Sequence, residues 1–265
     1  MKKLKVCIVG APNVGKSTLI NHIVGDKICI VSPKPHTTQE STLAVCNIKD
    51  CQLIFTDTPG FSASKKQNLI ILNKKVIEAL PNNDLVILMI DATKKLQNSN
   101  LITACAEIKN LIIIINKIDL VNKGVLLPLT DQLKTITPNI FYISALNGDG
   151  IDKILQLMIN RSICSDWLYE ADFITNRSYN DQIKDRIMEV LLTHLDKEVP
   201  YHTNITIDSY KENKREAILH CSLHTRQAHR HIILSKIKTI SVDLRRRMED
   251  WLRKTVHSFV QWHAY

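Results

Sequence analysis

The sequence predicts an α/β fold with a doubly wound, mostly parallel sheet, followed by a small α+β domain. Three observations lead to this prediction. Short apolar runs alternate with helical patterns over the first 160 residues, a glycine-containing turn joins the first run to the first helical pattern, and the alternation stops near residue 163. A length of 265 residues suits two domains, which we expect at 1–163 and 181–265 with a linker at 164–180.

The apolar runs of the first domain are expected to form parallel strands buried on both faces. These strands are Lys5–Val9, Cys51–Thr56, Leu85–Ile90, Leu111–Ile115 and Ile140–Ile143. A further run, Leu43–Ile48, is separated from Cys51 by two residues, so we expect an antiparallel hairpin at the sheet edge. Leu69, Leu72, Val76 and Leu80 follow near-helical spacing and predict a helix.

The second domain is predicted in the order helix, strand, strand, short helix, long helix, strand. Its first helix carries an apolar stripe of Ile183, Ile187, Val190 and Leu191. The later elements are expected at Asn204–Tyr210, Ala217–His224, Gln227–Leu234, from about Ser235, and at Val256–Trp262. Trp167, Tyr169 and Phe173 are expected to dock the linker, and Trp251 and Trp262 to lie in the core.

The composition limits the cellular compartment and the kinds of partner that we expect. No apolar run approaches the roughly 18 residues that a membrane-spanning helix needs. The seven cysteines are scattered without a CxxC pair, which favours a reducing cytoplasm over disulfides or a metal site. The net charge of +9 favours a polyanionic partner, although the excess is spread over both domains. We expect mainly a monomer, and peripheral contact with the inner membrane surface stays open.

The motif GAPNVGKS, from Gly10 to Ser17, is a phosphate-binding loop. Its glycines let successive N–H groups point at a β-phosphate where the next helix begins. Lys16 would bridge the β- and γ-phosphates, and the Ser17 hydroxyl would bind Mg²⁺. The nucleotide contacts expected here are Gly10, Asn13, Val14, Gly15, Lys16, Ser17 and Thr18.

The motif DTPG supplies the groups that respond to the γ-phosphate. Asp57 ends a predicted strand and would hold Mg²⁺ through water, while the Gly60 N–H would bond the γ-phosphate. Thr37 and Thr38 lie where a mobile loop can cap Mg²⁺, and we expect Thr38 to be the ligand. Lys16, Thr38 and Gly60 are the groups expected to act in catalysis.

Two further motifs select guanine. In NKID, the Asp119 carboxylate would accept hydrogen bonds from guanine N1–H and the exocyclic amine, whereas adenine would leave it unpaired. Asn116 belongs to the same site, and Lys117 is expected along the base plane, tied to the phosphate loop. The motif SAL adds Ser144, Ala145 and Leu146, with the Ala145 N–H expected at guanine O6. The sequence therefore predicts GTP and GDP binding.

Hydrolysis of GTP is expected to be slow or assisted. The residue after Gly60 is Phe61, and an apolar side chain cannot orient the attacking water. Such assistance is commonly worth about 10³ to 10⁵ in rate. Two interpretations of Asn13 stay open, as a K⁺ ligand against the phosphates or as an ordinary loop residue.

These residues resemble a known family. GAPNVGKST, the HTT segment at His36 to Thr38, DTPGF, NKIDL and SAL are similar to the Era GTPases of bacterial ribosome assembly. DRIMEVLLTHLDKEVPYHTNITIDSYKE, TRQAHRHIIL and KIKTISVDLRRRMEDWL resemble the family's C-terminal type II KH domain. The resemblance covers nearly the whole chain. It implies binding to 16S rRNA near its 3′ end on the small (30S) ribosomal subunit, controlled by the bound nucleotide.

The second domain departs from the family at its RNA clamp. KH domains hold the nucleic-acid backbone with a GxxG loop between two helices, but all seven glycines of this chain lie at or before Gly150. RNA would instead meet Arg226, Arg230, Lys236 and Lys238. Arg245, Arg246 and Arg247 are more typical of a solvated helix face. The histidines around Cys221 fit no standard zinc spacing. The alternative function is a GTP-gated module whose degenerate second domain binds protein.

Overall fold

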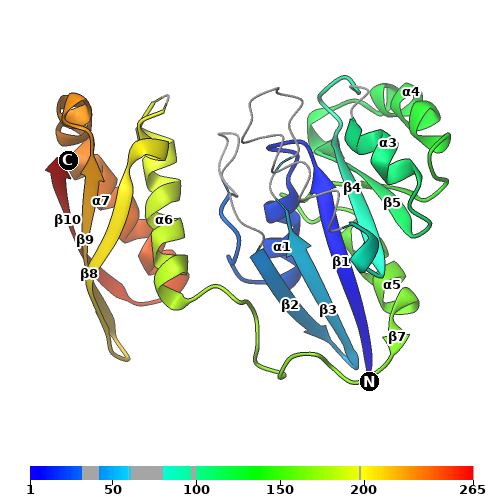
Figure 1. Cartoon of the computed structure of the whole chain (residues 1–265), viewed down its shortest axis with the longest axis horizontal. Helices are drawn as coiled ribbons and strands as arrows, with labels where there is room; N and C mark the ends of the chain where they lie inside the picture. Colours follow the sequence, from blue (N-terminus) through cyan, green and yellow to red (C-terminus); the bar gives the residue numbers. More distant parts are fainter. Residues whose placement is uncertain (32–41, 59, 61–79, 97–99, 197, 265) are drawn as a thin grey trace. The chain divides into compact units, whose positions relative to one another are not determined.

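The structure is a computed structural model, and it describes residues 1–31, 42–58, 60, 80–96, 100–196 and 198–264 (Figure 1). The chain divides into two compact units, Met1–Asn176 and Arg177–Tyr265.

The N-terminal unit is built on a mixed sheet with the strand order β2-β3-β1-β4-β5-β6. Pairs β3–β1, β1–β4, β4–β5 and β5–β6 are parallel, while β2 is antiparallel to β3 at the edge. The strands are β1 Lys2–Gly10, β2 Thr42–Ile48, β3 Cys51–Asp57, β4 Leu85–Asp91, β5 Leu111–Asn116 and β6 Ile140–Ile143. All six predicted strands and the edge hairpin are confirmed.

Helices cover both faces of this sheet, because alternate residues of each strand point to opposite sides. In β1, Val6 and Ile8 belong to the apolar cluster that includes residues of α1 (Lys16–Val24) and α5 (Ile151–Arg161). Their neighbours Cys7 and Val9 belong to the cluster on the α3 (Asn100–Ala106) and α4 (Lys123–Lys134) side. The doubly wound arrangement is confirmed, while most of the helix expected over Leu69–Leu80 lies outside the described residues.

Residues 163–176 are the last segment of the N-terminal unit, and we call them the strap. The strap begins with β7 (Ile163–Cys164), antiparallel to the start of β1. The Trp167 indole then donates to Asp50 O at 3.2 Å, as its predicted docking role requires. Farther on, Val45 N donates to Ile174 O at 2.8 Å. Most of the segment expected as a linker is therefore hydrogen-bonded to the sheet edge.

Gln52 fastens the middle of the strap. Its side chain is fully buried, and its Oε1 accepts from Leu168 N at 2.9 Å and from Tyr169 N at 3.0 Å. Its Nε2 donates to Tyr169 O at 3.0 Å and to Asn47 Oδ1 at 3.1 Å. One buried amide side chain therefore bonds three backbone groups of the strap.

The C-terminal unit packs two helices on one face of a three-stranded sheet of order β10-β9-β8. Its described elements are α6 Tyr179–His194, β8 Asn204–Glu212, β9 Glu216–Thr225, α7 Arg230–Leu252 and β10 Thr255–Ala264. The predicted stripe of α6 is buried, and Trp251 and Trp262 pack against the same core. Strand β9 is antiparallel to β8 and parallel to β10.

The prediction of two helices between β9 and β10 was wrong. A short 3-10 turn, Gln227–His229, leads directly into α7, which continues without a break through the expected boundary at Ser235. No glycine or proline occurs between residues 227 and 252, so no residue there interrupts the helical hydrogen bonds. With 23 residues α7 is long enough to cross a bilayer but too polar, and no other described helix qualifies.

Candidate functional site

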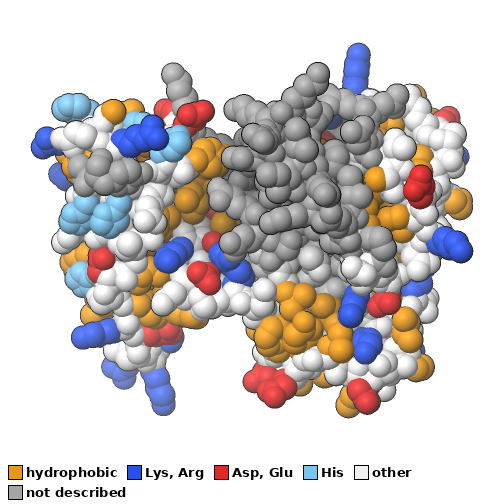
Figure 2. All heavy atoms as spheres, in the orientation of Figure 1, with side chains coloured by type: hydrophobic (Ala, Val, Ile, Leu, Met, Phe, Trp, Pro, Cys, Tyr) orange, Lys and Arg blue, Asp and Glu red, His pale blue; other side chains and the backbone are white. Residues whose placement is uncertain are grey.

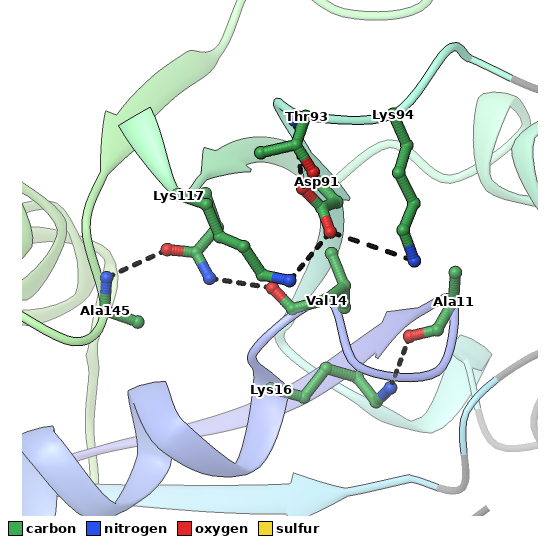
Figure 3. Close-up of polar contacts among 9 residues, drawn as sticks. Ala11, Val14, Lys16, Asp91, Thr93, Lys94, Lys117 and Ala145 are labelled. Carbon is green, nitrogen blue, oxygen red and sulfur yellow. Dashed lines mark hydrogen bonds and ion pairs between the residues drawn. The ribbon is translucent and has the colours of Figure 1, made fainter. Parts of the chain in front are cut away.

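The candidate site lies at the carboxyl ends of the parallel strands of the N-terminal unit, where α/β sheets bind ligands (Figure 3). Residues Gly10–Ser17 turn from β1 into α1 there. Gly15 has φ +106°, and a Cβ on it would lie 2.2 Å from Asn116 Nδ2. A Cβ on Gly60 would lie 2.7 Å from Pro12 Cα. Both glycines allow close approaches that any side chain would block.

Lys16 is held under the phosphate loop. Its side chain is buried, and its Nζ donates to Gly10 O at 3.2 Å and to Ala11 O at 3.1 Å. Burial lowers the pKa of Lys16 to about 8, although the Asp57 carboxylate opposes this shift. A buried ammonium that donates to two neutral carbonyls would be stabilised by any phosphate that enters the loop.

Ser17 and Asp57 form the part of the site that fits a Mg²⁺ ion. Ser17 Oγ donates to Asp57 Oδ2 at 2.8 Å, and Asp57 is fully buried. Within the described residues, Asp57 Oδ1 has no hydrogen-bond partner. Burial raises the pKa of Asp57, although Lys16 and the Ser17 hydroxyl oppose the rise. A hard divalent cation would satisfy this oxygen and the carboxylate charge, so the donor set fits magnesium.

Asn116 joins three segments of the site. Its Nδ2 donates to Val14 O at 2.7 Å, and its Oδ1 accepts from Ala145 N at 2.8 Å. The side chain is nearly fully buried. One amide thereby links the phosphate loop, the end of β5 and the loop after β6. The Ala145 N–H bonds Asn116 here, and its expected contact with guanine O6 stays a prediction.

Lys117 is tied to β4 instead of the phosphate loop. Its backbone is left-handed, with φ +66°, and its Nζ lies 2.7 Å from Asp91 Oδ2. Asp91 Oδ1 accepts from Thr93 N at 3.0 Å and from Thr93 Oγ1 at 2.6 Å (Figure 3). Burial alone would raise the pKa of Asp91, but these bonds and the Lys117 charge outweigh it and lower that pKa.

Asn21 shapes the loop that follows α1. Its Oδ1 accepts from Ile28 N at 2.9 Å and from Cys29 N at 2.8 Å, and its Nδ2 donates to Cys29 O. These three bonds position Ile30 and Val31, which immediately follow, at the wall of the cleft. Nothing in the sequence singles out this asparagine, because it stands inside an ordinary helical pattern.

A cleft of about 540 Å³ brings most of the predicted nucleotide residues together. Those that line it are Asn13, Gly15, Lys16, Ser17, Thr18, Gly60, Asn116, Lys117, Asp119, Ser144, Ala145 and Leu146. The others, Gly10, Val14 and Asp57, are hydrogen-bonded to Lys16, Asn116 and Ser17. Thr38 and Phe61 lie outside the described residues.

Sequence reasoning missed several residues of the cleft. Asp91 could have been found, because it ends β4 as Asp57 ends β3, at the same edge of the sheet. Two missed lining residues, Pro12 and Leu120, stand inside motifs but were not assigned a contact. The others, Ile30, Val31 and Lys94, lie outside the motifs and carry no signal of their own.

The four basic residues predicted to contact RNA differ from one another in exposure and in hydrogen bonding. Arg226, Arg230 and Lys238 are exposed. Lys236 instead donates to His194 O at 2.6 Å and lies 3.8 Å from Asp196, at the end of α6. Lys236 therefore caps a helix in this structure, which the sequence pattern did not predict.

The three consecutive arginines of α7 also differ from one another. Arg245 and Arg246 are exposed, which agrees with a solvated face. Arg247 instead donates to Asp243 Oδ2 at 3.1 Å and lies 3.8 Å from the buried Glu189 of α6. Since Arg247 links the two helices, its role is structural packing.

Fold and site together define a P-loop protein whose cleft is arranged for a guanine nucleotide. A family model described as "50S ribosome-binding GTPase" matches residues 5–117. GTPase Era of Rickettsia prowazekii is 33% identical over all of this chain and 94% of its own length. GTPase Era of Nitratidesulfovibrio vulgaris is 29% identical, over 95% of this chain and 88% of its own length. This chain belongs to the Era GTPase family, and it binds and hydrolyses GTP.

Two solved structures are similar over 100% of this chain and 94% of their own chains, each with a TM-score of 0.87. One is an Aquifex aeolicus Era variant bound to GDP.AlF4-, at 29% identity. The other is Era in complex with MgGDPNP and nucleotides 1506-1542 of 16S ribosomal RNA, at 28% identity. Both units of this chain therefore follow the Era fold.

Proposed function

We propose that this chain is a Mg²⁺-dependent GTP switch that acts in small-subunit assembly by binding 16S rRNA near its 3′ end. The supporting observation is its similarity, over the whole chain, to Era solved with MgGDPNP and a 16S rRNA fragment. We propose a cytoplasmic and mainly monomeric protein.

The phosphate end of the cleft would hold the triphosphate and its metal ion. Lys16 would contact the β- and γ-phosphates, and the Gly60 N–H would respond to the γ-phosphate. Ser17 and Thr38 would bind Mg²⁺ directly, and Asp57 would hold it through water. The ion would neutralise charge on the phosphate oxygens. The hydrogen bond from Ser17 to Asp57 supports this assignment, because it aims both oxygens at one place.

The other end of the cleft would select guanine. Asp119 is exposed to the cleft and can accept from guanine N1–H and the exocyclic amine. Asn116 and Lys117, held by Ala145 and Asp91, would border the base. A purine without this donor pair would leave the Asp119 carboxylate unpaired, which disfavours adenine.

Hydrolysis would need help in placing water, because Phe61 follows Gly60. A K⁺ ion held by Asn13 is one source of such help. Asn13 lines the cleft with φ +61°, and it stands in the phosphate loop. GTP turnover compared in K⁺ and in Na⁺, with and without Asn13→Ala, tests this role. Equal rates in all four cases would leave Asn13 as a loop residue.

The C-terminal unit would supply the RNA contacts. The continuous helix α7 leaves no glycine loop, so Arg226, Arg230 and Lys238 would carry the phosphate contacts. Lys236, which caps α6, would contribute less than the sequence suggested. The alternative of a module that binds only protein is not favoured, because the whole second unit retains the Era fold.

Binding of a 16S rRNA 3′ fragment to the full chain, measured over a salt series, tests this function. Replacing Arg226, Arg230 and Lys238 with alanine should weaken binding and reduce the salt slope by about 3. Arg245→Ala with Arg246→Ala is the matched control, since these exposed arginines lie elsewhere on α7. Wild-type binding with no preference for the fragment over unrelated RNA would contradict the proposal.

A further inference from the structure

The outward face of the C-terminal sheet carries paired aromatic rings. Helices α6 and α7 pack on the other face, where the alternate residues Ala217, Leu219, Cys221 and Leu223 of β9 lie in the core. The outward residues of β9 are Ile218, His220, Ser222 and His224, and those of β10 are His257, Phe259, Gln261 and His263. Figure 2 shows histidine side chains gathered over the β9 and β10 part of this unit.

Two ring pairs form because the registers of β9 and β10 place the residues opposite each other. His220 pairs with Phe259 and His224 with His263 across the parallel strands. The first pair stacks with ring centroids 4.6 Å apart and an interplanar angle of 13°. The second stacks at 5.1 Å and 21°. The pairs are four residues apart along each strand, or about 13 Å.

A polar hollow of about 410 Å³ adjoins the first pair. His220 and Phe259 line it together with Asp208, Ser209, Ser222 and Gln261. A bulge between Ile207 and Ser209 of β8 leaves both Asp208 and Ser209 on the outward side, and Asp208 Oδ2 accepts from Ser222 Oγ at 2.6 Å. The hollow thus combines aromatic rings with hydrogen-bonding groups at one side.

We propose that this sheet face is a binding surface for single-stranded RNA, in which one base enters the hollow and extends the His220–Phe259 stack. Aromatic rings on a sheet bind any base through its π-face, and polar neighbours meet the base edge. The Asp208 carboxylate accepts hydrogen bonds, so it favours a base with an exocyclic amino group, such as cytosine. The His224–His263 pair offers a second stacking place along the strand.

Charge and composition favour RNA over protein as the occupant. The C-terminal unit holds 16 lysines and arginines against 11 aspartates and glutamates, a net charge of +5. Three basic residues could contact RNA phosphates: Lys211 on the outward side of β8, and Lys214 and Arg215 in the adjoining hairpin. Of the exposed large hydrophobic residues in the described chain, Phe259 alone belongs to this face, too few for an apolar interface core.

Arg226, Arg230 and Lys238 do not line the hollow, and the inference shares with the proposed function only the premise that the chain binds RNA. The test measures fluorescence anisotropy of single-stranded oligo(C) and oligo(U) with the full chain. Phe259→Ala should weaken binding about tenfold, the usual range for one stacked base. Phe259→Tyr keeps the ring and should bind as the wild type does. Val242→Ala is the matched control, because Val242 is a comparably exposed apolar residue on α7.

A second variant tests the selectivity of the hollow. Asp208→Ala should move the ratio of oligo(C) to oligo(U) affinity toward one, whatever its effect on overall charge. Wild-type affinity of Phe259→Ala, with a folded state verified by circular dichroism and GTP turnover, would overturn the inference. So would a Phe259→Ala change in sedimentation without a change in RNA affinity, which would mark an interface between copies.

The remaining outcomes separate the two proposals. If the wild-type chain binds neither the oligonucleotides nor the 16S rRNA fragment, the proposed function fails as well. If it binds RNA and only the Arg226, Arg230 and Lys238 variants lose affinity, the sheet-face inference alone fails.

Discussion

Lys117 Nζ lies 2.7 Å from Asp91 Oδ2, so the last residue of β4 holds the lysine that follows β5. Two bonds from Thr93 fix the carboxylate in turn. The lysine that we propose borders the base therefore has a defined position without a nucleotide. Such preorganisation lowers the ordering cost of binding.

Replacing Asp91 should weaken nucleotide binding. Asp91→Asn removes the charge that holds Lys117, and we expect about tenfold faster dissociation of a fluorescent GDP analogue, as for loss of one charged hydrogen bond. Lys134→Ala is the control, because Lys134 is 63% exposed and lies 3.7 Å from Asp131, and neither residue lines the cleft. Unchanged dissociation in Asp91→Asn would show that Lys117 needs no partner.

Gly15 should be intolerant of a side chain. Gly15→Ala would place Cβ 2.2 Å from Asn116 Nδ2 and force apart the bonds from Asn116 to Val14 and Ala145. We expect about 2–4 kcal/mol lower free energy of unfolding, from two lost hydrogen bonds and a left-handed alanine. Gly124→Ala, with open space in α4, should instead be neutral or stabilising. Equal urea midpoints for both variants would contradict this.

Nucleotide affinity should fall with rising pH because of Lys16. Its pKa is about 8 in the protein, and an adjacent phosphate would raise it again. Below about pH 8 the Lys16 ammonium is already charged, so nucleotide binding takes up no proton. Above about pH 8 nucleotide binding must protonate Lys16, and the nucleotide affinity therefore falls. Calorimetry in two buffers at about pH 9 should therefore detect proton uptake. Lys16→Met removes this group, and persistent uptake in that variant would assign it elsewhere.

Gln52 should control how firmly the strap is held. Gln52→Leu would leave the N–H groups of Leu168 and Tyr169 without their partner, at about 1–3 kcal/mol for each unsatisfied group. Hydrogen exchange of residues 167–176 should accelerate in this variant. Gln132→Leu, at an exposed position of α4, should leave exchange as in the wild type. Slow exchange in Gln52→Leu would show that the backbone bonds to β2 suffice.

Much of the N-terminal unit could be predicted because its signals are local. The continuous apolar runs set the strands, and the residue types in the phosphate and guanine motifs indicated their chemistry before any geometry was known. Asp91 and Gln52 were missed because their partners Lys117 and Tyr169 lie 26 and 117 residues away, whereas Asn21 was missed because it stands inside an ordinary helical pattern. Only the folded chain brings Gln52 next to Tyr169 or Asp91 next to Lys117.

The C-terminal unit contains features that the sequence could not predict. Strand and helix positions followed from periodicity, but the break expected at Ser235 was wrong, since no glycine or proline of this chain interrupts the helix there. The ring pairs of β9 and β10 depend on the register between two strands joined by a long helix. Sequence spacing alone does not determine that register.

The most direct test of guanine selectivity is calorimetry of GTP and ATP binding to the magnesium-loaded chain, with Asp119→Asn beside the wild type. We expect the wild type to bind GTP and reject ATP, because only guanine presents two donors to Asp119. Asp119→Asn should lose GTP affinity and gain affinity for xanthosine triphosphate, whose second keto group suits an amide donor. Equal binding of ATP and GTP by the wild type would contradict the account.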